Sequence, residues 1–304
     1  EEAKNAPANA KIVDIKAGKG KGEYKFAMAV SPLDCMGCGE CVTVCPTKAI
    51  TMVPQDSQAD QQAVFDYCVA NISKKPSKFA DDTVIGSQFN QPLLEFSGSC
   101  AGCAETSYAR LITQLFGEKM YISNATGCSS IWGGTASISP YTVNKDSGHG
   151  PAWCNSLFED NAEFGYGMFL AQDTLRKRVQ KKLQAVREEA HDDAKALIDE
   201  YFATENDGKA NAAATKKLVS ALEQCPAKDG LVGEILAAKN YLSKKSQWIF
   251  GGDGWAYDIG YGGLDHVIAS KQDVNIFVFD TEVYSNTGGQ ASKASNIGEV
   301  CQFA

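Results

Sequence analysis

Twelve residues, CMGCGECVTVCP at 35–46, constrain this chain more than any other feature of its sequence. They follow the spacing C-x2-C-x2-C-x3-C-P, in which a tight loop offers three thiolates to one cubane cluster of iron and sulfur. Zinc is disfavoured, because zinc sites rarely place three cysteines at this double spacing. The run therefore predicts a [4Fe-4S] cluster, with ligands among Cys35, Cys38, Cys41 and Cys45.

A second run of this kind is missing from the sequence. In proteins with two such clusters the fourth cysteine ligates the other cluster, so Cys45 is expected to serve a cluster whose remaining ligands lie outside this chain. We interpret residues 1–75 as the C-terminal part of a ferredoxin-like domain with two [4Fe-4S] clusters, followed by a linker. The chain is thus expected to be part of a longer polypeptide.

Composition excludes several other classes of protein. The net charge of −8 argues against a nucleic-acid binder. No apolar run approaches the roughly 20 residues that span a bilayer. The 11 cysteines stand in a chain whose first residues show no export signal, which favours metal or redox chemistry over disulfides. We expect a cytoplasmic protein that binds neither nucleic acid nor membrane.

From residue 76 onward the pattern predicts an α/β domain. Short apolar stretches at 92–96, 119–123, 247–250 and 274–279 are expected to be strands, with helices near 108–115 and 261–270. Residues 168–245 keep apolar residues at helical spacing among many charged ones, which predicts a helical insertion that is mostly surface. The expected architecture over 76–304 is a parallel sheet flanked by helices, carrying this insertion and truncated at its end.

The stretch GGDGWAYDIG at 251–260 predicts a diphosphate and metal site. The dinucleotide fingerprint is excluded, because Tyr257 stands where it requires a third glycine. Asp253 ends one expected strand and Thr281 follows the next, and such strand ends meet at one edge of a parallel sheet. Magnesium prefers a carboxylate and other oxygens together with phosphate oxygens. The protein's share of the magnesium ligands could come from Asp253, the Thr281 hydroxyl and a nearby carbonyl.

This pattern resembles the thiamine-diphosphate motif, Gly-Asp-Gly followed further along by an amide residue. Here Thr281 occupies the usual amide position and Asn286 comes later. Thiamine diphosphate supports decarboxylation of 2-oxo acids, and iron–sulfur clusters remove electrons singly, so the two motifs imply oxidative decarboxylation. Cys100 and Cys103 in SGSCAGCAET then resemble half of a cluster site beside the thiamine, with Cys128 as a third ligand.

Five motifs together make the chain similar to the long single-chain pyruvate:ferredoxin oxidoreductases (pyruvate synthases) over essentially all 304 residues. They are CMGCGECVTVCP, SGSCAGCAET, TGCSSIWGG, GGDGWAYDIGYGGLDH and DTEVYSNTGGQ. The resemblance implies conversion of pyruvate and coenzyme A to acetyl-coenzyme A and carbon dioxide, with electrons passed to ferredoxin or flavodoxin. It also implies a homodimer.

The resemblance assigns the site residues one by one. The cluster next to the thiamine is expected on Cys100, Cys103 and Cys128, and magnesium on Asp253, Thr281 and the Val283 carbonyl. Asn286 is expected to be catalytic. The residues expected to bind the cofactor are Glu105, Cys128, Gly252, Asp253, Gly254, Trp255, Thr281, Glu282, Val283, Tyr284, Ser285 and Asn286.

The family places further parts outside this sequence. The fourth cysteine of the thiamine-side cluster lies beyond residue 304, so none of Cys154, Cys225 and Cys301 is expected to be that ligand. The pyruvate-binding arginine and threonine, and the glutamate that activates the thiamine, lie before residue 1. These 304 residues alone are therefore expected to be inactive.

Two alternative functions fit the same motifs. A pyruvate:NADP oxidoreductase would carry a reductase domain appended downstream. An electron-transfer module without thiamine chemistry would use the Gly-Asp-Gly segment only as a turn. Bound thiamine diphosphate in the complete protein separates this module from both enzymes.

Overall fold

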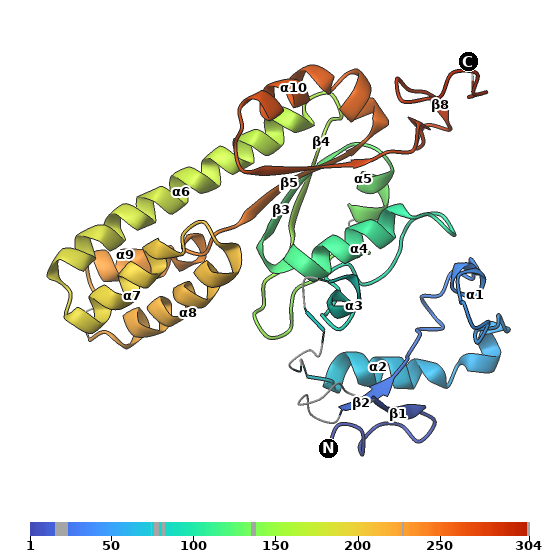
Figure 1. Ribbon diagram of the computed structural model, residues 1–304, viewed down its shortest axis with the longest axis horizontal. Helices are drawn as coiled ribbons and strands as arrows, with labels where there is room; N and C mark the ends of the chain where they lie inside the picture. The colour runs from blue at the N-terminus through green and yellow to red at the C-terminus, as the bar shows by residue number, and fades with distance from the viewer. Residues whose placement is uncertain are drawn as a thin grey trace. The chain divides into compact units, whose positions relative to one another are not determined.

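The computed structural model describes residues 1–15, 24–73, 75, 79–80, 83–134, 138–226 and 228–302 (Figure 1). Contacts within the chain divide it into two compact units, Glu1–Leu115 and Phe116–Ala304. The segment 76–115, which we expected to begin the second domain, is grouped by its contacts with the first unit. A domain boundary at residue 75 stays a prediction.

The first unit combines a two-stranded sheet with short helices. Strands β1 (Ile12–Ile15) and β2 (Tyr24–Ala27) pair antiparallel. The first residues contact the helix at 61–71, where the Tyr67 hydroxyl donates to the Glu2 carbonyl at 2.7 Å. The helices are α1 (Glu40–Thr43), η1 (Gln55–Gln58), α2 (Gln61–Asn71), α3 (Val84–Ser87) and α4 (Glu105–Phe116).

The strand expected at 92–96 does not form. Only Leu94 there makes an isolated bridge. Leu93 and Leu94 are both buried, at 2% and 1% exposure. Successive residues of a strand point to opposite faces, so two buried neighbours do not fit a strand with one solvated face. Pro92 also lacks an N–H for a ladder. The segment is irregular and buried.

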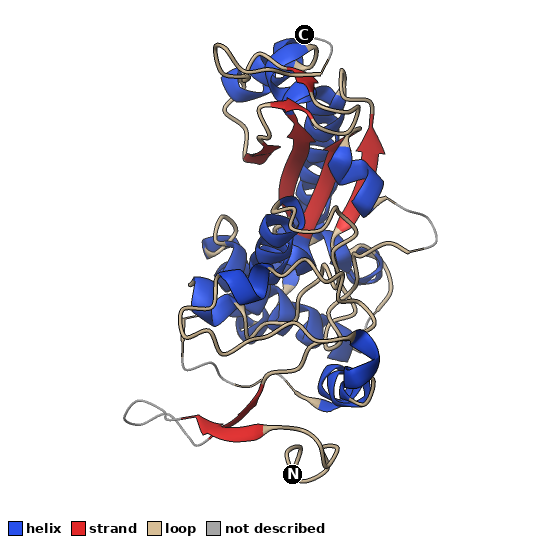
Figure 2. Cartoon of the chain, turned by 90° about the vertical axis from the view of Figure 1, so that its right-hand side faces the viewer, coloured by secondary structure: helices blue, strands red, loops and turns tan. Residues whose placement is uncertain are grey.

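The second unit is built on a four-stranded parallel sheet in the order β4-β3-β5-β6 (Figure 2). The strands are β3 (Met120–Ala125), β4 (Ala152–Ser156), β5 (Ser246–Gly252) and β6 (Val274–Phe279). All three adjacent pairs are parallel. This confirms the expected strands near 119–123, 247–250 and 274–279, whereas β4 was not predicted.

Each face of this sheet has its own apolar layer. On one face α6 (Asn161–Glu189) and α10 (Tyr261–Ala269) pack through a core that contains Ile249 and Leu264. The other face carries the aromatic side chains of Trp248, Phe250, Phe277 and Phe279, and Phe279 meets Trp132 of α5 (Cys128–Gly133) edge to face. The predicted parallel sheet flanked by helices is confirmed.

The helical insertion is present and has a hydrophobic core of its own. It comprises the second half of α6 with α7 (Asp192–Ala203), α8 (Gly208–Gln224), α9 (Leu231–Ala237) and η3 (Lys239–Tyr241). Figure 1 shows these helices gathered at one end of α6, whose first half packs on the sheet. The insertion is therefore a small packed bundle as well as a surface feature. Its buried residues are Val179, Leu183, Ile198, Tyr201, Leu218, Leu222, Ile235 and Leu242.

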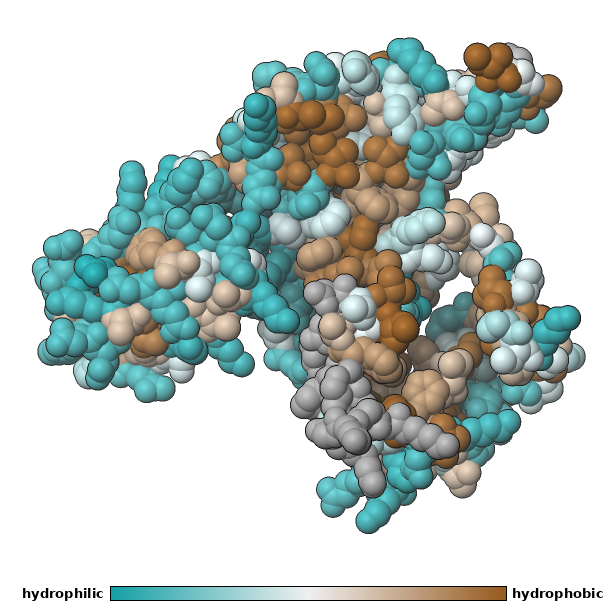
Figure 3. Space-filling view, viewed as in Figure 1, coloured by the Kyte–Doolittle hydropathy of each residue, from teal (hydrophilic) through white to brown (hydrophobic). Residues whose placement is uncertain are grey.

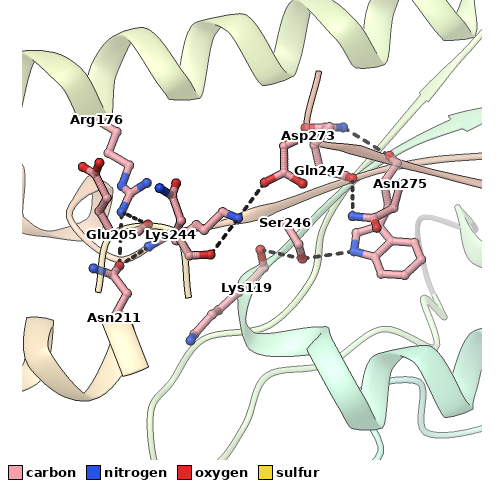
Figure 4. Close-up of polar contacts among 11 residues, drawn as sticks. Lys119, Arg176, Glu205, Asn211, Lys244, Ser246, Gln247, Asp273 and Asn275 are labelled. Atoms are coloured by element: carbon pink, nitrogen blue, oxygen red, sulfur yellow. Dashed lines mark hydrogen bonds and ion pairs between the residues drawn. The ribbon is translucent and has the colours of Figure 1, made fainter. Parts of the chain in front are cut away.

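A polar junction links this bundle to the sheet (Figure 4). Arg176 donates to the carbonyls of Glu205 at 2.8 Å and Leu242 at 3.2 Å. The fully buried Asn211 accepts from Arg176 at 3.3 Å and from the Lys244 N–H at 2.8 Å. Lys244 lies two residues before β5, so one hydrogen-bonded group joins both parts.

None of the helices in the described part of the chain is both long and apolar enough to cross a membrane. The longest, α6, has 29 residues but carries many charged side chains. Figure 3 shows hydrophilic residues over most of the visible surface of the insertion.

Candidate metal and cofactor site

The structure brings Asp253 and Thr281 together at the carboxyl edge of the sheet. Asp253 directly follows β5, and Thr281 stands two residues after β6, its parallel neighbour. The Thr281 N–H donates to Asp253 Oδ1 at 2.9 Å, and the Thr281 hydroxyl lies 3.3 Å from the same oxygen. The sequence prediction that these two side chains meet at one edge is confirmed.

The Val283 carbonyl joins this pair because the backbone turns sharply between them. Glu282 has a φ of 62°, in the left-handed region that a residue with a Cβ rarely adopts. The turn brings the Val283 carbonyl back to accept from the Thr281 hydroxyl at 3.0 Å. Beyond it, β7 (Val283–Tyr284) pairs antiparallel with β8 (Gln290–Ala291).

Two of the separations among these three oxygens are close to those between magnesium ligands. Ligands about 2.1 Å from Mg²⁺ at right angles lie about 3.0 Å from one another. The Thr281 hydroxyl stands 3.0 Å from the Val283 carbonyl and 3.3 Å from Asp253 Oδ1, so small shifts satisfy an octahedral edge. The remaining positions would fall to diphosphate oxygens and water, as Mg²⁺ usually arranges them.

The environment of Asp253 also favours the binding of a cation. The residue is only 2% exposed. Its carboxylate accepts from Thr281 and from the Ser292 hydroxyl at 2.9 Å, and within the described residues it has no Lys, Arg or His partner. A buried charge is costly unless it is paired or binds a metal. A divalent ion would remove this cost.

Two tyrosine–carboxylate pairs surround Asp253. The Tyr257 hydroxyl donates to Asp280 Oδ2 at 2.8 Å, and this bond, followed by burial, raises the pKa of Tyr257 to about 12. Burial, followed by a hydrogen bond to Asp258, raises the pKa of Tyr284 to about 12. Both hydroxyls therefore stay protonated at neutral pH, and three carboxylates give this edge a negative field that favours a cation.

The glycine-flanked loop after β5 begins with an unusual turn. Residues Gly254–Asp258 form a π-helix, in which the Ile259 N–H reaches the Gly254 carbonyl at 3.1 Å. Such turns recur at functional sites. Trp255, predicted to bind the cofactor, is 1% exposed and packs its indole against Gly251 and Gly260. The indole thus supports the loop from the core side.

Cys128 and the stretch after β6 also meet at this edge. Cys128 begins α5 after the end of β3, and its sulfur lies 3.3 Å from the Ser285 hydroxyl. Asn286 follows in an exposed turn. Of the predicted cofactor residues, the second unit therefore holds Cys128, 252–255 and 281–286 around one edge of its sheet.

In the first unit, the backbone of the iron–sulfur run has the form expected of a cluster loop. Gly37 and Gly39 adopt φ values of 70° and 78°, which only glycine takes readily. The Cys45 sulfur accepts from the Ala49 N–H at 3.3 Å and lies 3.6 Å from the Thr47 hydroxyl. The Thr47 bond, followed by the Ala49 bond, lowers the pKa of the Cys45 thiol. Both effects favour a thiolate ligand.

The sulfurs of this run do not converge in the structure. Among the described residues, no three His, Cys, Asp or Glu side chains are close enough to hold a metal ion. Cys35, Cys38 and Cys41 are exposed. Metal binding and local folding are coupled in such loops, so the cluster itself is expected to draw the thiolates together. The ligand assignment stays a prediction.

The second cysteine pair forms a tight turn beside the first run. The Cys103 N–H donates to the Cys100 carbonyl at 3.0 Å, and Gly102 has a φ of 79°. A Cβ on Gly102 would stand 3.3 Å from Glu40 Oε1, so the turn lies against the run that contains Glu40. Glu105, predicted to touch the cofactor, begins α4 and is buried.

Cys100 and Cys103 belong to the first unit and Cys128 to the second, so a site that all three share stays a prediction. The remaining cysteines lie on ordinary elements. Cys68 is in α2, Cys154 in β4, and Cys225 caps the C-terminus of α8. The Cys301 sulfur lies 3.8 Å from the Ser295 hydroxyl. That none of the last three binds a cluster also stays a prediction.

Sequence reasoning missed three residues of this site, Ser292, Ser295 and Asn296. All three hydrogen-bond to Asp253 or Glu282. The signal that could have found them is the pair Gly288 and Gly289, whose positive φ values turn the chain back. A reversal there places the residues after it beside the residues before it.

Comparisons with known proteins show that this chain is similar to a segment of several pyruvate oxidoreductases. Residues 28–51 match the model of the 4Fe-4S binding domain. The chain is 51% identical over 294 residues to the pyruvate-flavodoxin oxidoreductase of Klebsiella pneumoniae, covering 95% of the chain and 25% of that protein. It is 52% identical over 299 residues to the pyruvate:ferredoxin oxidoreductase of Moorella thermoacetica, covering 94% of the chain and 25% of that protein.

A third relative is named for a different electron acceptor. The chain is 47% identical over 291 residues to the mitochondrial pyruvate dehydrogenase [NADP(+)] of Euglena gracilis, covering 94% of the chain and 16% of that protein. The chain therefore spans about a quarter, or less, of the length of these relatives.

Proposed function

Because this chain is homologous to a quarter-length segment of the pyruvate:ferredoxin and pyruvate-flavodoxin oxidoreductases, we propose that it supplies the thiamine site and part of the electron path of such an enzyme. The complete protein would convert pyruvate and coenzyme A to acetyl-coenzyme A and carbon dioxide, and pass electrons through [4Fe-4S] clusters to ferredoxin or flavodoxin. The resemblance further suggests a cytoplasmic homodimer.

One observation carries the thiamine part of the proposal. Asp253 is a buried carboxylate with no Lys, Arg or His partner among the described residues, and two further oxygens lie near it at the spacing of an octahedral edge. Asp253, Thr281 and the Val283 carbonyl would hold Mg²⁺ and, through it, the diphosphate of the cofactor. Thiamine diphosphate, when bound, supplies the electron sink for loss of carbon dioxide from a 2-oxo acid.

The protein's own residues have separate tasks at this edge. The Thr281 N–H fixes the orientation of the Asp253 carboxylate. The Tyr257 and Tyr284 hydroxyls stay protonated and hydrogen-bond to the Asp280 and Asp258 carboxylates. Trp255 keeps the Gly-Asp-Gly loop packed on the sheet.

The proximity of the two cysteine loops supports the electron-transfer part. Within the first unit, the Cys100–Cys103 turn lies against Glu40 of the Cys35–Cys45 run. Clusters bound at the two loops would be neighbours, so an electron could pass from one to the other. Cys35, Cys38 and Cys41 would hold one cluster, and Cys100 and Cys103 would hold half of the next.

The NADP-linked relative supports a second candidate for the final acceptor. A pyruvate dehydrogenase [NADP(+)] shares 47% identity with this chain, so the thiamine and iron–sulfur parts fit that enzyme equally well. The two candidates differ only in which group takes the electrons after the clusters.

The test is the replacement Asp253→Ala in the complete protein, with Asp265→Ala on the exposed surface of α10 as the matched control. Asp253→Ala should lose most bound thiamine diphosphate and magnesium, measured after desalting, while the iron content stays at the parent's value. Asp265→Ala should keep both. An Asp253→Ala protein that retains stoichiometric thiamine diphosphate would refute the assignment.

A further inference from the structure

The chain reverses after the proposed magnesium ligands and returns to contact them. After the turn at Gly288 and Gly289, strand β8 runs antiparallel to β7 and delivers residues 292–296 back to Asp253 and Glu282. We call residues 292–296 the return segment. It contributes no oxygen to the predicted magnesium ligands, yet three of its side chains bond to residues that present them.

The first of these side chains fixes Asp253. The Ser292 hydroxyl donates to Asp253 Oδ2 at 2.9 Å and accepts from the Ala294 N–H at 3.0 Å. The accepted N–H bond uses one lone pair of the hydroxyl and leaves its O–H to donate to the carboxylate. Oδ1 accepts from the Thr281 N–H, so both oxygens of the Asp253 carboxylate are hydrogen-bonded. It cannot rotate without breaking one of these bonds.

The other two side chains hold Glu282 in its left-handed conformation. The Ser295 hydroxyl donates to the Glu282 carbonyl, and the Asn296 amide donates to Glu282 Oε2 at 2.8 Å. A non-glycine residue in this region is strained, and the surrounding structure must maintain it. This strain has a direct use, since the turn at Glu282 is what aims the Val283 carbonyl at Thr281.

We propose that Ser292, Ser295 and Asn296 are positioning residues for the divalent cation, an assignment that rests on the proposed magnesium site. They fix the two parts of the site that are free to move, the Asp253 carboxylate and the Glu282 turn. Their loss should weaken cation binding about 10- to 100-fold, as loss of an outer partner of a metal ligand generally does.

The experiment measures Mn²⁺ binding in place of Mg²⁺ on the complete protein, with thiamine diphosphate in fixed excess. The unbound ion is counted from its room-temperature electron paramagnetic resonance signal. Ser292→Ala and Asn296→Ala should each weaken binding by at least about tenfold. Ser292→Thr keeps the hydroxyl and should restore most of the affinity. Lys293→Arg, between them on the same segment, keeps the exposed positive charge beside Asp258; it is the matched control and should bind as the parent does.

A matched pair at Glu282 tests the strain directly. Glu282→Gly and Glu282→Ala both lose the bond to Asn296, but only glycine adopts the observed φ of 62° without cost. Glu282→Gly should therefore bind Mn²⁺ nearly as the parent does, whereas Glu282→Ala should bind about tenfold more weakly. A purely general loss of packing would affect both alike.

The outcomes separate this inference from the proposed function. If Asp253→Ala abolishes Mn²⁺ binding while Ser292→Ala and Asn296→Ala bind as the parent does, the positioning role is wrong and the magnesium site stands. If Ser292→Thr is as weak as Ser292→Ala, the hydroxyl is not responsible and the inference also fails. If Asp253→Ala itself binds normally, the proposed site is wrong. Iron content identical to the parent's shows that each variant has folded.

Discussion

The polar junction between the insertion and the sheet allows a quantitative prediction for Arg176→Met. The guanidinium donates to three acceptors, and each hydrogen bond from a charged donor contributes about 1.5–3 kcal/mol. A simple sum would give about 5–9 kcal/mol. The structure argues for much less, because two of the three acceptors keep another donor after the substitution.

The remaining donors can be counted from the contacts. The Leu242 carbonyl still accepts from the Tyr201 hydroxyl at 2.9 Å, and Asn211 Oδ1 still accepts from the Lys244 N–H at 2.8 Å. Only the Glu205 carbonyl is left without a donor among the described residues. One orphaned acceptor together with the loss of a charged donor costs about 2–4 kcal/mol.

Hydrogen exchange on the complete protein is the suitable assay, because it reports local opening in a chain that does not unfold in one step. If the free energy of local opening falls by about 2–4 kcal/mol, amide hydrogen exchange in α7, α8 and α9 should speed up about 30- to 900-fold. Exchange in α10 should not change. The control Lys177→Met removes an exposed i,i+4 ion pair one residue away and should change exchange very little. Equal effects of the two substitutions would refute the reasoning about the junction.

Three further predictions concern packing, pH and electron flow. Gly165→Ala should destabilise the protein by about 1–3 kcal/mol, because its Cβ would stand 2.3 Å from Ser123 Oγ. Gly167→Ala, with no atom within 4 Å, should be neutral or stabilising, and equal melting temperatures would contradict the contrast. A hydrogen bond from Lys75, followed by one from Ser73, lowers the pKa of Glu2 from 4.5 to about 2. The contacts of Glu2 with Ser73 and Lys75 are therefore stabilising above pH 4.5 and weaken as the pH falls toward 2. Pepsin cleavage near residue 2 should rise over that window in the parent and show no such step in Glu2→Gln; a parallel rise in both would argue against it. Cys38→Ser should slow viologen reduction and lower iron content while thiamine diphosphate content stays constant; loss of thiamine diphosphate together with iron would contradict the separation of the two sites.

The sequence predicted the sheet well where apolar runs are bounded by clear signals. Stretches such as 247–250 and 274–279 are too short and too rich in β-branched and aromatic residues to be helices. The first is followed by Gly251 and Gly252, and the second by Asp280. Since parallel strands share one carboxyl edge, the meeting of Asp253 and Thr281 followed from the strand assignments alone. At Asp253 and Thr281, the strand pattern of the sequence and the observed parallel sheet lead to the same placement.

The prediction failed where burial is irregular. The apolar stretch at 92–96 was expected to be a strand, but Leu93 and Leu94 are both buried and no ladder forms. In α4 the apolar residues Tyr108, Ile112 and Leu115 recur at helical spacing, yet Tyr108 and Leu115 are exposed while Ala109 and Ile112 are buried. Local periodicity identified the helix and did not identify which face would be covered.

The return segment could not be predicted for a different reason. Ser292, Ser295 and Asn296 have no periodicity, and small polar residues are common in loops that bind nothing. Their role depends on a left-handed Glu282 and on a chain reversal, and neither is visible until the backbone is known. Such residues are found from contacts and not from composition.

Trp255 has an optical consequence. Its indole is buried, and its Nε1 has no hydrogen-bond partner in the described part of the chain. An indole in such apolar, unbonded surroundings emits at short wavelength, and emission moves to the red when water reaches it. Trp255 lies two residues after Asp253, so a protein with the other three tryptophans changed to Phe would report the state of this loop by fluorescence alone. The loop could then be followed in real time, without a label, during rapid mixing.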